Sequence, residues 1–393
     1  MKPVNKPLKK ITYVQLLLLH VGLALVVFSI KSTSLFIFIG IIIYFIFRII
    51  SNGNKKDEVL LAAAYITGYE VFSRMTGGTI TYEFAKYAVI GFLTLGMFYK
   101  GFNRKSWAYL FFLIILVPGV IFSVLNLSYE SNVANAIGFN LSGPVCLAIS
   151  ALYCYNRKMS SQRLQEILLA LLLPVISMTT YLYVFTPNIR DVLTGTQSNF
   201  ETSGGFGPNQ VSTVLGLGMF ILFSRLFMNK SKLVNIIDIS LLVLVSYRAI
   251  VTFSRGGVIV AAICAFAFFV FYYLKSVGKE RASLIPKIVF ISMIIIATWV
   301  YTSISTLGLI DKRYANQNAA GIEKEDISAG RLDLINTELK AFYENPWTGV
   351  GVGKTKEFRI ELTGRVTASH NEMTRILSEH GVFGLLGLLI LIE

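Results

Sequence analysis

Residues 34–50 read Ser-Leu-Phe-Ile-Phe-Ile-Gly-Ile-Ile-Ile-Tyr-Phe-Ile-Phe-Arg-Ile-Ile, an apolar run of the kind that fills a lipid bilayer. A hydrocarbon core of ~30 Å needs ~20 apolar residues in a helix. Similar runs recur along the chain of 393 residues, which is 54% hydrophobic and 15% charged. Its mean hydropathy of +0.64 is too high for a soluble domain. The sequence therefore predicts a helical membrane protein whose solvent is lipid.

The apolar runs predict an all-α fold, a polytopic transmembrane helical bundle of about twelve spans. The basic start of the chain resembles a signal peptide, but no small-residue cleavage site follows, so we interpret it as an uncleaved first span. The last run is cut short, which indicates either an unusually short span or a truncated chain. The candidate spans are residues 11–30, 34–50, 58–73, 83–99, 107–126, 136–154, 164–185, 210–228, 233–253, 256–274, 285–304 and a last run from Gly381.

The basic residues orient these spans, because Lys and Arg concentrate on the cytoplasmic side of membrane proteins. With a cytoplasmic N-terminus in a bacterial inner membrane, every inner loop receives a basic cluster and the short outer loops receive almost none. This pattern accounts for the net charge of +14, so we exclude nucleic acid as a partner. The clusters are Lys55 and Lys56; Lys100, Arg104 and Lys105; Arg157, Lys158 and Arg163; Lys230 and Lys232; and Lys275, Lys279, Arg281 and Lys287.

The same topology places two longer polar segments on the outer face, residues 186–209 and 305–380. The second segment is predicted to be a mainly helical outer loop between the last two spans. The chain is therefore divided into a transmembrane bundle at 1–304, an outer-face loop domain at 305–380 and a last, apparently truncated span at 381–393.

The outer-face loop domain has the pattern of a small helical cap. Apolar spacing predicts an amphipathic helix over residues 328–343, and Asn345-Pro346 ends it. The three glycines of the stretch 349–353 then predict a flexible or tightly turned segment. The stretch leads into Gly-Lys-Thr, but Thr348 stands where a phosphate-binding loop needs glycine. We therefore interpret it as a structural turn.

Two arginines near the outer ends of predicted spans are candidate anion-binding residues. Arg255 lies in the stretch Thr-Phe-Ser-Arg-Gly-Gly at 252–257, beside two glycines that let the backbone turn. A guanidinium at headgroup depth either binds a lipid-linked phosphate through paired hydrogen bonds or snorkels to lipid headgroups. Arg248 lies deeper on about the same helix face, where charge is costly and usually functional. Asn209 is either a cap of the eighth span or a ligand contact.

Charged pairs also occur within the predicted spans. Glu70 and Arg74 have the spacing of an ion pair on one helix, and Glu83 with Lys86 has a similar spacing. Each pair is interpreted as structural, with the lining of a cavity as the alternative. The three cysteines fall inside apolar runs and predict neither a disulfide nor a zinc site.

The chain contains three histidines. His20 is predicted to be a packing residue in the first span, and His380, at the mouth of the last span, is predicted to be interfacial. His370 lies among polar residues on the outer face, where a second helix is predicted to start. An imidazole that titrates near neutrality is the usual group that takes a proton from a hydroxyl. His370 is therefore a candidate general base.

Four motifs in this order carry a resemblance to a known family. They are Thr-Phe-Ser-Arg-Gly-Gly at 252–257, Ala-Gly-Arg at 329–331, Asn-Pro-Trp-Thr-Gly-Val-Gly at 345–351, and His370-Asn371 leading into Glu-His-Gly-Val-Phe-Gly at 379–384. With the long outer loop before the last span, they resemble the O-antigen ligase and polymerase superfamily. The resemblance covers roughly residues 205–390.

The resemblance implies a metal-independent glycosyltransferase without a cofactor, which acts at the outer face of the inner membrane. Arg255 and Arg331 match the family's arginines and are expected to bind the diphosphate of the donor, and His370 is expected to be the catalytic base. Further candidates for substrate binding are Arg248, Asn209, Asn371 and Arg375. The expected partners are an undecaprenyl-diphosphate-linked glycan donor, a glycan or lipid acceptor, membrane lipids and, as an additional candidate, a chain-length regulator.

The leading function is polymerisation of lipid-linked repeat units into surface polysaccharide. Ligation of a finished glycan to a lipid A core or to protein uses the same residues, and the stretches 203–210 and 140–144 favour a polymerase by resemblance. A secondary transporter is a second alternative, with intramembrane Glu70, Arg74, Lys86 and Arg248 as its substrate or ion sites. The sequence lacks the two related halves common in transporters, and a scaffold without chemistry leaves the outer arginines unexplained.

Overall fold

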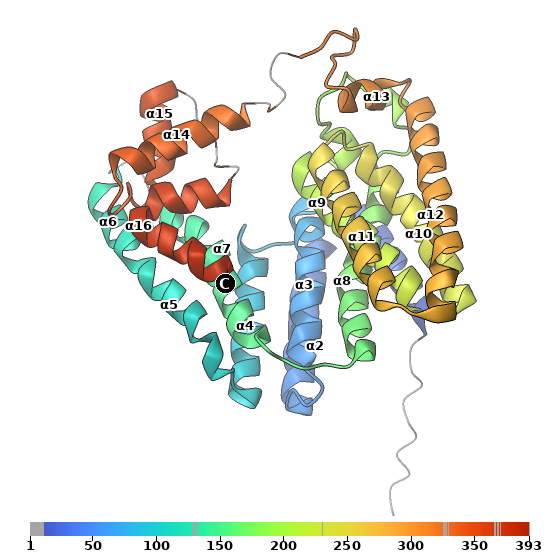
Figure 1. The fold of residues 1–393 in the computed structure, drawn as a ribbon, viewed down its shortest axis with the longest axis horizontal. Coiled ribbons are helices and arrows are strands. Elements are labelled where there is room, and N and C mark those ends of the chain that lie inside the picture. Colours follow the sequence, from blue (N-terminus) through green and yellow to red (C-terminus); the bar gives the residue numbers. More distant parts are fainter. Residues whose placement is uncertain are drawn as a thin grey trace, which may run out of the picture. The chain divides into compact units, whose positions relative to one another are not determined.

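Helices contain most of the described residues of the chain (Figure 1). The computed structural model describes residues 12–128, 132–229, 231–324, 328, 330–364, 367, 369 and 371–392. Over these residues no strand occurs, and the extended pairing is limited to an isolated bridge between Gln317 and Glu323. The predicted all-α fold is confirmed.

Every predicted span overlaps at least one helix, and nine helical segments in the described residues are long and apolar enough to cross a membrane. The sequence predicted about twelve spans. The helices α1 and α4 have 17 residues each, and α3 carries three charged residues, so these fall short. The helices are α1 (Tyr13–Ser29), α2 (Thr33–Asn52), α3 (Glu58–Met75), α4 (Phe84–Lys100), α5 (Trp107–Ile115), α6 (Val117–Asn126), α7 (Val133–Cys154), α8 (Ser161–Phe185), α9 (Pro208–Met228), α10 (Lys232–Ile250), α11 (Arg255–Lys275), α12 (Gly278–Ser305) and α16 (Glu372–Ile392).

Burial differs sharply among these apolar helices. Within its most apolar window, α9 is 67% buried, whereas α11 is 11% buried and α12 is 17% buried. Apolar side chains that protein does not cover need lipid around them. The chain is therefore a multi-pass membrane protein, in which α9 is a central helix and α11 and α12 carry lipid-facing surface.

The chain divides into two compact units. In unit 1, α9 packs against α8, α10 and α11, and α8 also packs against α1. In unit 2, α7 packs against α4 and α5, and the core around Phe112, Leu116 and Ala148 includes Ile390 and Leu391 of α16. The predicted division at residues 304 and 380 follows membrane topology and stays a prediction. Unit 1 comprises Met1–Tyr44, Ala64–Ile80 and Ser160–Lys324, and unit 2 comprises Phe45–Ala63, Thr81–Met159 and Glu325–Glu393.

Within unit 1, two glycines allow close packing of α9 and α11. A Cβ atom at Gly257 would lie 2.1 Å from the carbonyl oxygen of Ser212, and one at Gly216 would lie 2.4 Å from that of Gly257. Both obstacles are backbone atoms, so no side-chain rotation relieves the clash. Gly256 differs, because a Cβ there meets nothing within 4 Å.

Replacing Gly257 with alanine is therefore expected to destabilise the protein by roughly 1–3 kcal/mol, the usual cost of overpacking. The measurement is the midpoint of thermal unfolding in detergent micelles. Gly256→Ala is the matched control, because it adds the same methyl group one residue earlier on the open side of α11. Equal midpoints for the two variants would contradict the close approach of α9 and α11.

The segment 305–380 is mainly helical over its described residues, as predicted. The helix predicted over 328–343 is α14, and it ends at a C-cap on Asn345. The three glycines that follow have positive φ values, so the predicted tight turn is confirmed. The sequence analysis missed α15, because its polar sequence has no apolar stripe of helical period. The helices of this segment before α16 are α13 (Leu309–Tyr314), α14 (Arg331–Glu344) and α15 (Lys354–Thr363).

The predicted helix cap at Asn209 is wrong. Asn209 does not cap α9, because Gly207 is the N-cap and the proline after it starts the helix. The His380 side chain is 1% exposed and lies against Gly119, where a Cβ would lie 2.2 Å from the His380 Nδ1 atom, and its interfacial depth stays a prediction. His20 is a buried packing residue, as predicted.

Candidate functional site

The turn between α10 and α11, residues 251–254, forms the centre of the candidate site in unit 1. Hydrogen bonds to neighbouring segments hold it in place. Phe253, in this turn, is fully buried with φ of 57°, a conformation that a bulky residue keeps only where its surroundings hold it. The carbonyl of Thr252 accepts a hydrogen bond from the Asn199 amide at 3.0 Å. The Ser254 hydroxyl donates to Asn209 Oδ1 at 2.8 Å. The turn therefore joins α9, α10, α11 and the segment before α9.

Arg255 follows this turn as the first residue of α11. Its Nη1 donates to the carbonyl oxygen of Arg313 at 3.4 Å, and Arg313 Nε donates to the carbonyl oxygen of Phe253 at 2.9 Å. Arg313 Nη2 reaches the Ser198 hydroxyl at 3.4 Å. A helix N-terminus carries partial positive charge, which adds to that of the guanidiniums and favours an anion. Arg313 was not among the predicted site residues, although it is a cation in the predicted outer segment 305–380.

Lys324 is the third cation of this group. Its Nζ donates to Thr196 Oγ1 at 3.0 Å. Burial and the positive charges of Arg313 and Arg255 lower the pKa of the Lys324 amine. Burial raises the pKa of Tyr314 to about 12, against the effect of the same two arginines. Arg255, Arg313 and Lys324 are called the cationic cluster below.

Arg248 has well-defined contacts of its own. Its side chain is 1% exposed, and its Nη2 donates to the carbonyl oxygens of Leu182 at 2.6 Å and Thr186 at 2.7 Å. The guanidinium also lies over the ring of Tyr183. Because these carbonyls are at the C-terminal end of α8, the cation stabilises the negative end of that helix. Its role in substrate binding stays a prediction.

The charged residues within the spans form the ion pairs that their spacing predicts. In unit 1, Arg74 Nη2 lies 2.5 Å from Glu70 Oε1. In unit 2, Lys86 pairs with Glu83, and the hydroxyl of Ser142 donates to Glu83 Oε2 at 3.0 Å. Their structural role stays a prediction.

The remaining predicted site residues belong to unit 2. Arg331 is exposed as the first residue of α14 and follows Gly330, whose φ is 78°. His370 lies outside the described residues. Asn371 precedes α16, and its Oδ1 accepts a hydrogen bond from the Met373 amide at 3.0 Å, so it shapes the start of that helix.

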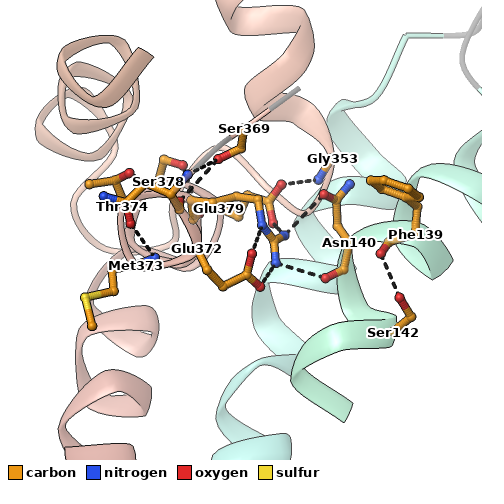
Figure 2. Close-up of polar contacts among 12 residues, drawn as sticks. Phe139, Asn140, Ser142, Gly353, Ser369, Glu372, Met373, Thr374, Ser378 and Glu379 are labelled. Carbon is orange, nitrogen blue, oxygen red and sulfur yellow. Dashed lines mark hydrogen bonds and ion pairs between the residues drawn. The ribbon is translucent and has the colours of Figure 1, made fainter. Parts of the chain in front are cut away.

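Arg375 is the centre of a polar network between α16 and α7. Figure 2 labels its partners Asn140, Glu372 and Glu379. Its Nε donates to Glu372 at 2.9 Å and its Nη2 pairs with the same carboxylate. Its Nη1 donates to Glu379 Oε2 at 2.5 Å and to Asn140 Oδ1 at 3.2 Å, and its Nη2 donates to the Asn140 carbonyl at 3.0 Å. These bonds engage all the donors that a guanidinium has. The network thus gives Arg375 a structural role, and substrate binding by it stays a prediction.

The glycine-rich turn, residues 349–353, is hydrogen-bonded to α16 close to the break in that helix. The Val350 amide donates to the Ser378 carbonyl at 2.9 Å, and the Gly353 amide donates to Glu379 Oε1 at 2.8 Å. Gly381 interrupts the helix with φ of 59° and ψ of −136°. A Cβ atom there would lie 2.6 Å from the Gly349 amide nitrogen. The motifs at 345–351 and 379–384, which are separate in the sequence, therefore pack directly against each other.

A buried ion pair between α14 and α15 was also not predicted. Arg359 Nη2 lies 2.7 Å from Glu338 Oε1, and the two side chains are 2% and 0% exposed. Arg359 also donates to the Thr367 carbonyl, and the hydroxyl of Thr374 donates to Glu338. The pair therefore contacts Thr367 and Thr374, which precede and follow His370 in the sequence. No single-sequence signal distinguished these two charges from exposed ones on α14 and α15.

Comparison with known protein families gives a match to one part of the chain. Residues 240–389 match the family model described as O-Antigen ligase, a segment that is less than half of the chain. The predicted resemblance to the O-antigen ligase and polymerase superfamily is thus confirmed for the part that contains Arg255, Arg331 and His370. The chain has no significant match among curated proteins or among solved structures.

The family implies a glycosyltransferase of O-antigen ligase or polymerase type. Such an enzyme needs a lipid-linked glycan donor and an acceptor in a membrane. The multi-pass helical fold is the kind of structure that such substrates require, because their lipid parts stay in the bilayer.

Proposed function

We propose that this protein polymerises undecaprenyl-diphosphate-linked oligosaccharides into O-antigen or a related surface polysaccharide. The observation that supports the proposal most is that the family-matched segment holds Arg255 at a helix N-terminus beside Arg313. Two guanidiniums and a helix N-terminus suit the binding of a diphosphate. The proposed site faces the periplasm from the inner membrane, and the N-terminus is cytoplasmic.

The proposed reaction is a displacement at the anomeric carbon of the donor sugar. The hydroxyl of an acceptor sugar attacks that carbon, a new carbon–oxygen bond forms, and the bond to the diphosphate oxygen breaks. His370 takes the proton of the attacking hydroxyl. Arg255 and Arg331 stabilise the negative charge that develops on the diphosphate, and no metal ion or cofactor takes part.

Replacement of His370 with alanine is expected to abolish polymer assembly while the protein stays in the membrane, because the base is lost. The measurement is the banding of extracted surface polysaccharide from a deletion strain that carries the variant. Met373→Ala is a suitable control, since this side chain is exposed in the first turn of α16 and is close to His370 in the sequence. Full-length polymer from the His370→Ala strain would contradict the assignment of His370 as the catalytic base.

Ligation to a lipid acceptor is the second candidate, because the matched family is described as O-Antigen ligase. The same banding separates the two functions. Loss of the ladder with one repeat unit still attached indicates a missing polymerase. Loss of all attached glycan, with free polymer still made on its carrier, indicates a missing ligase.

A further inference from the structure

Among the described residues, each member of the cationic cluster donates a hydrogen bond to an oxygen atom of unit 1. Arg313 is bonded to the Phe253 carbonyl and the Ser198 hydroxyl, and Lys324 is bonded to the Thr196 hydroxyl. Thr196 is in turn held in place, because its hydroxyl donates to the carbonyl oxygen of Gln317 at 2.8 Å. The segment before α9 therefore supplies hydroxyl groups to two of the three cations.

A small hairpin brings Lys324 to this group. The Lys324 amide donates to the Asn316 carbonyl at 3.0 Å, and the Asn318 amide donates to the Ile322 carbonyl at 2.8 Å. The hairpin follows α13, whose end carries Arg313. The hairpin thus brings the chain back towards Arg313 of α13. Lys324 therefore lies close enough to Arg255 of α11 and Arg313 for their charges to act on its amine.

Among the described residues, positive charge surrounds the Lys324 amine. Burial and the positive charges of Arg313 and Arg255 lower the pKa of this amine. Asp311, two residues before Arg313, accepts hydrogen bonds from Trp299 and Ser303 of α12. Like charges held together cost free energy, and a bound anion offsets that cost.

We propose that Lys324 and Arg313 bind the same anionic group as Arg255, a phosphate or diphosphate ester. Neither residue lies in the motifs that carry the family resemblance. The inference rests on the proposed function only in taking the anion to be the diphosphate of the glycan donor. All three side chains are partly exposed, so a ligand has access to them.

The test uses the full-length protein in lipid nanodiscs with inorganic pyrophosphate as the probe. Lys324→Gln is expected to weaken pyrophosphate binding roughly tenfold, the effect of one lost charge-assisted hydrogen bond. Lys324→Arg keeps the charge and is expected to bind nearly as the parent protein does. Lys312→Gln is the matched control, because it removes the same charge from a side chain bonded to the Ala319 carbonyl. Arg313→Gln is a second loss variant.

Binding to Lys324→Gln that equals the parent, or an equal loss in Lys312→Gln, would overturn the inference. Thermal stabilisation of each variant by pyrophosphate gives a second readout, which also shows that the variants are folded. The polysaccharide assay in the deletion strain separates this inference from the proposed function. If pyrophosphate binding depends on Lys324 but the parent protein restores no polymer, the anion site stands and the polymerase assignment fails.

Discussion

Replacing Arg255 with glutamine is expected to slow glycan transfer roughly 100- to 1,000-fold, the usual cost of removing one well-placed donor from a developing negative charge. The position supports so large an effect. Arg255 starts α11, and the turn before it is fixed through Asn199 and Asn209. The guanidinium is thereby aimed before substrate arrives, so little reorganisation is needed during the reaction. The measurement is the rate of polymer formation by purified protein from a lipid-linked donor.

The control for this effect is Arg190→Gln. Arg190 is an exposed arginine of unit 1 with long bonds to the carbonyls of Ile304 and Ser305, so its replacement removes one positive charge from the same unit. Arg255→Lys tests geometry, because lysine keeps the charge but cannot form paired bonds to a phosphate. A lipid-anchoring role for Arg255 predicts similar modest changes in all three variants. A diphosphate-binding role predicts a large loss in Arg255→Gln alone and a partial loss in Arg255→Lys.

The helical fold was predictable because hydrophobic length is a strong local signal. An apolar run such as residues 34–50 predicts a membrane-spanning helix. The helix α2 includes all of these residues. The polar helix α15 was missed, since its place depends on tertiary contacts such as the Arg359–Glu338 pair. The local sequence pattern therefore predicts apolar helices that span the membrane. It does not predict polar helices such as α15, which depend on tertiary contacts.

The candidate site was predictable only where a motif pointed to it. Arg255 was identified from its neighbours in the chain, but Arg313 and Lys324 reach the cluster through a helix and a hairpin that the sequence did not reveal. The roles of buried charges were also hidden. Arg248 has the sequence context of a ligand residue, and its contacts are with the end of α8. Sequence gives the charge at a position, whereas its partners depend on the fold.

Arg375, which follows His370 by five positions in the sequence, is expected to serve the fold. Its partner Glu379 is 1% exposed, and that carboxylate also accepts the Gly353 amide of the glycine-rich turn. Arg375→Met leaves the carboxylate buried without its cation. Because an unpaired buried charge is costly, we expect a loss of roughly 3–5 kcal/mol in the free energy of unfolding. The measurement is the unfolding midpoint in detergent.

A matched pair on α14 sets the scale for this loss. Lys340 and Glu344 have the same spacing as Arg375 and Glu379, but their side chains are 53% and 50% exposed, so Lys340→Met is expected to cost at most about 1 kcal/mol. The double variant Arg375→Met with Glu379→Met removes both charges and is expected to regain part of the stability. Arg375→Met with parental stability but poor donor binding would instead assign Arg375 to the substrate. A stability loss that Glu379→Met relieves assigns it to the junction of α7, α16 and the glycine-rich turn.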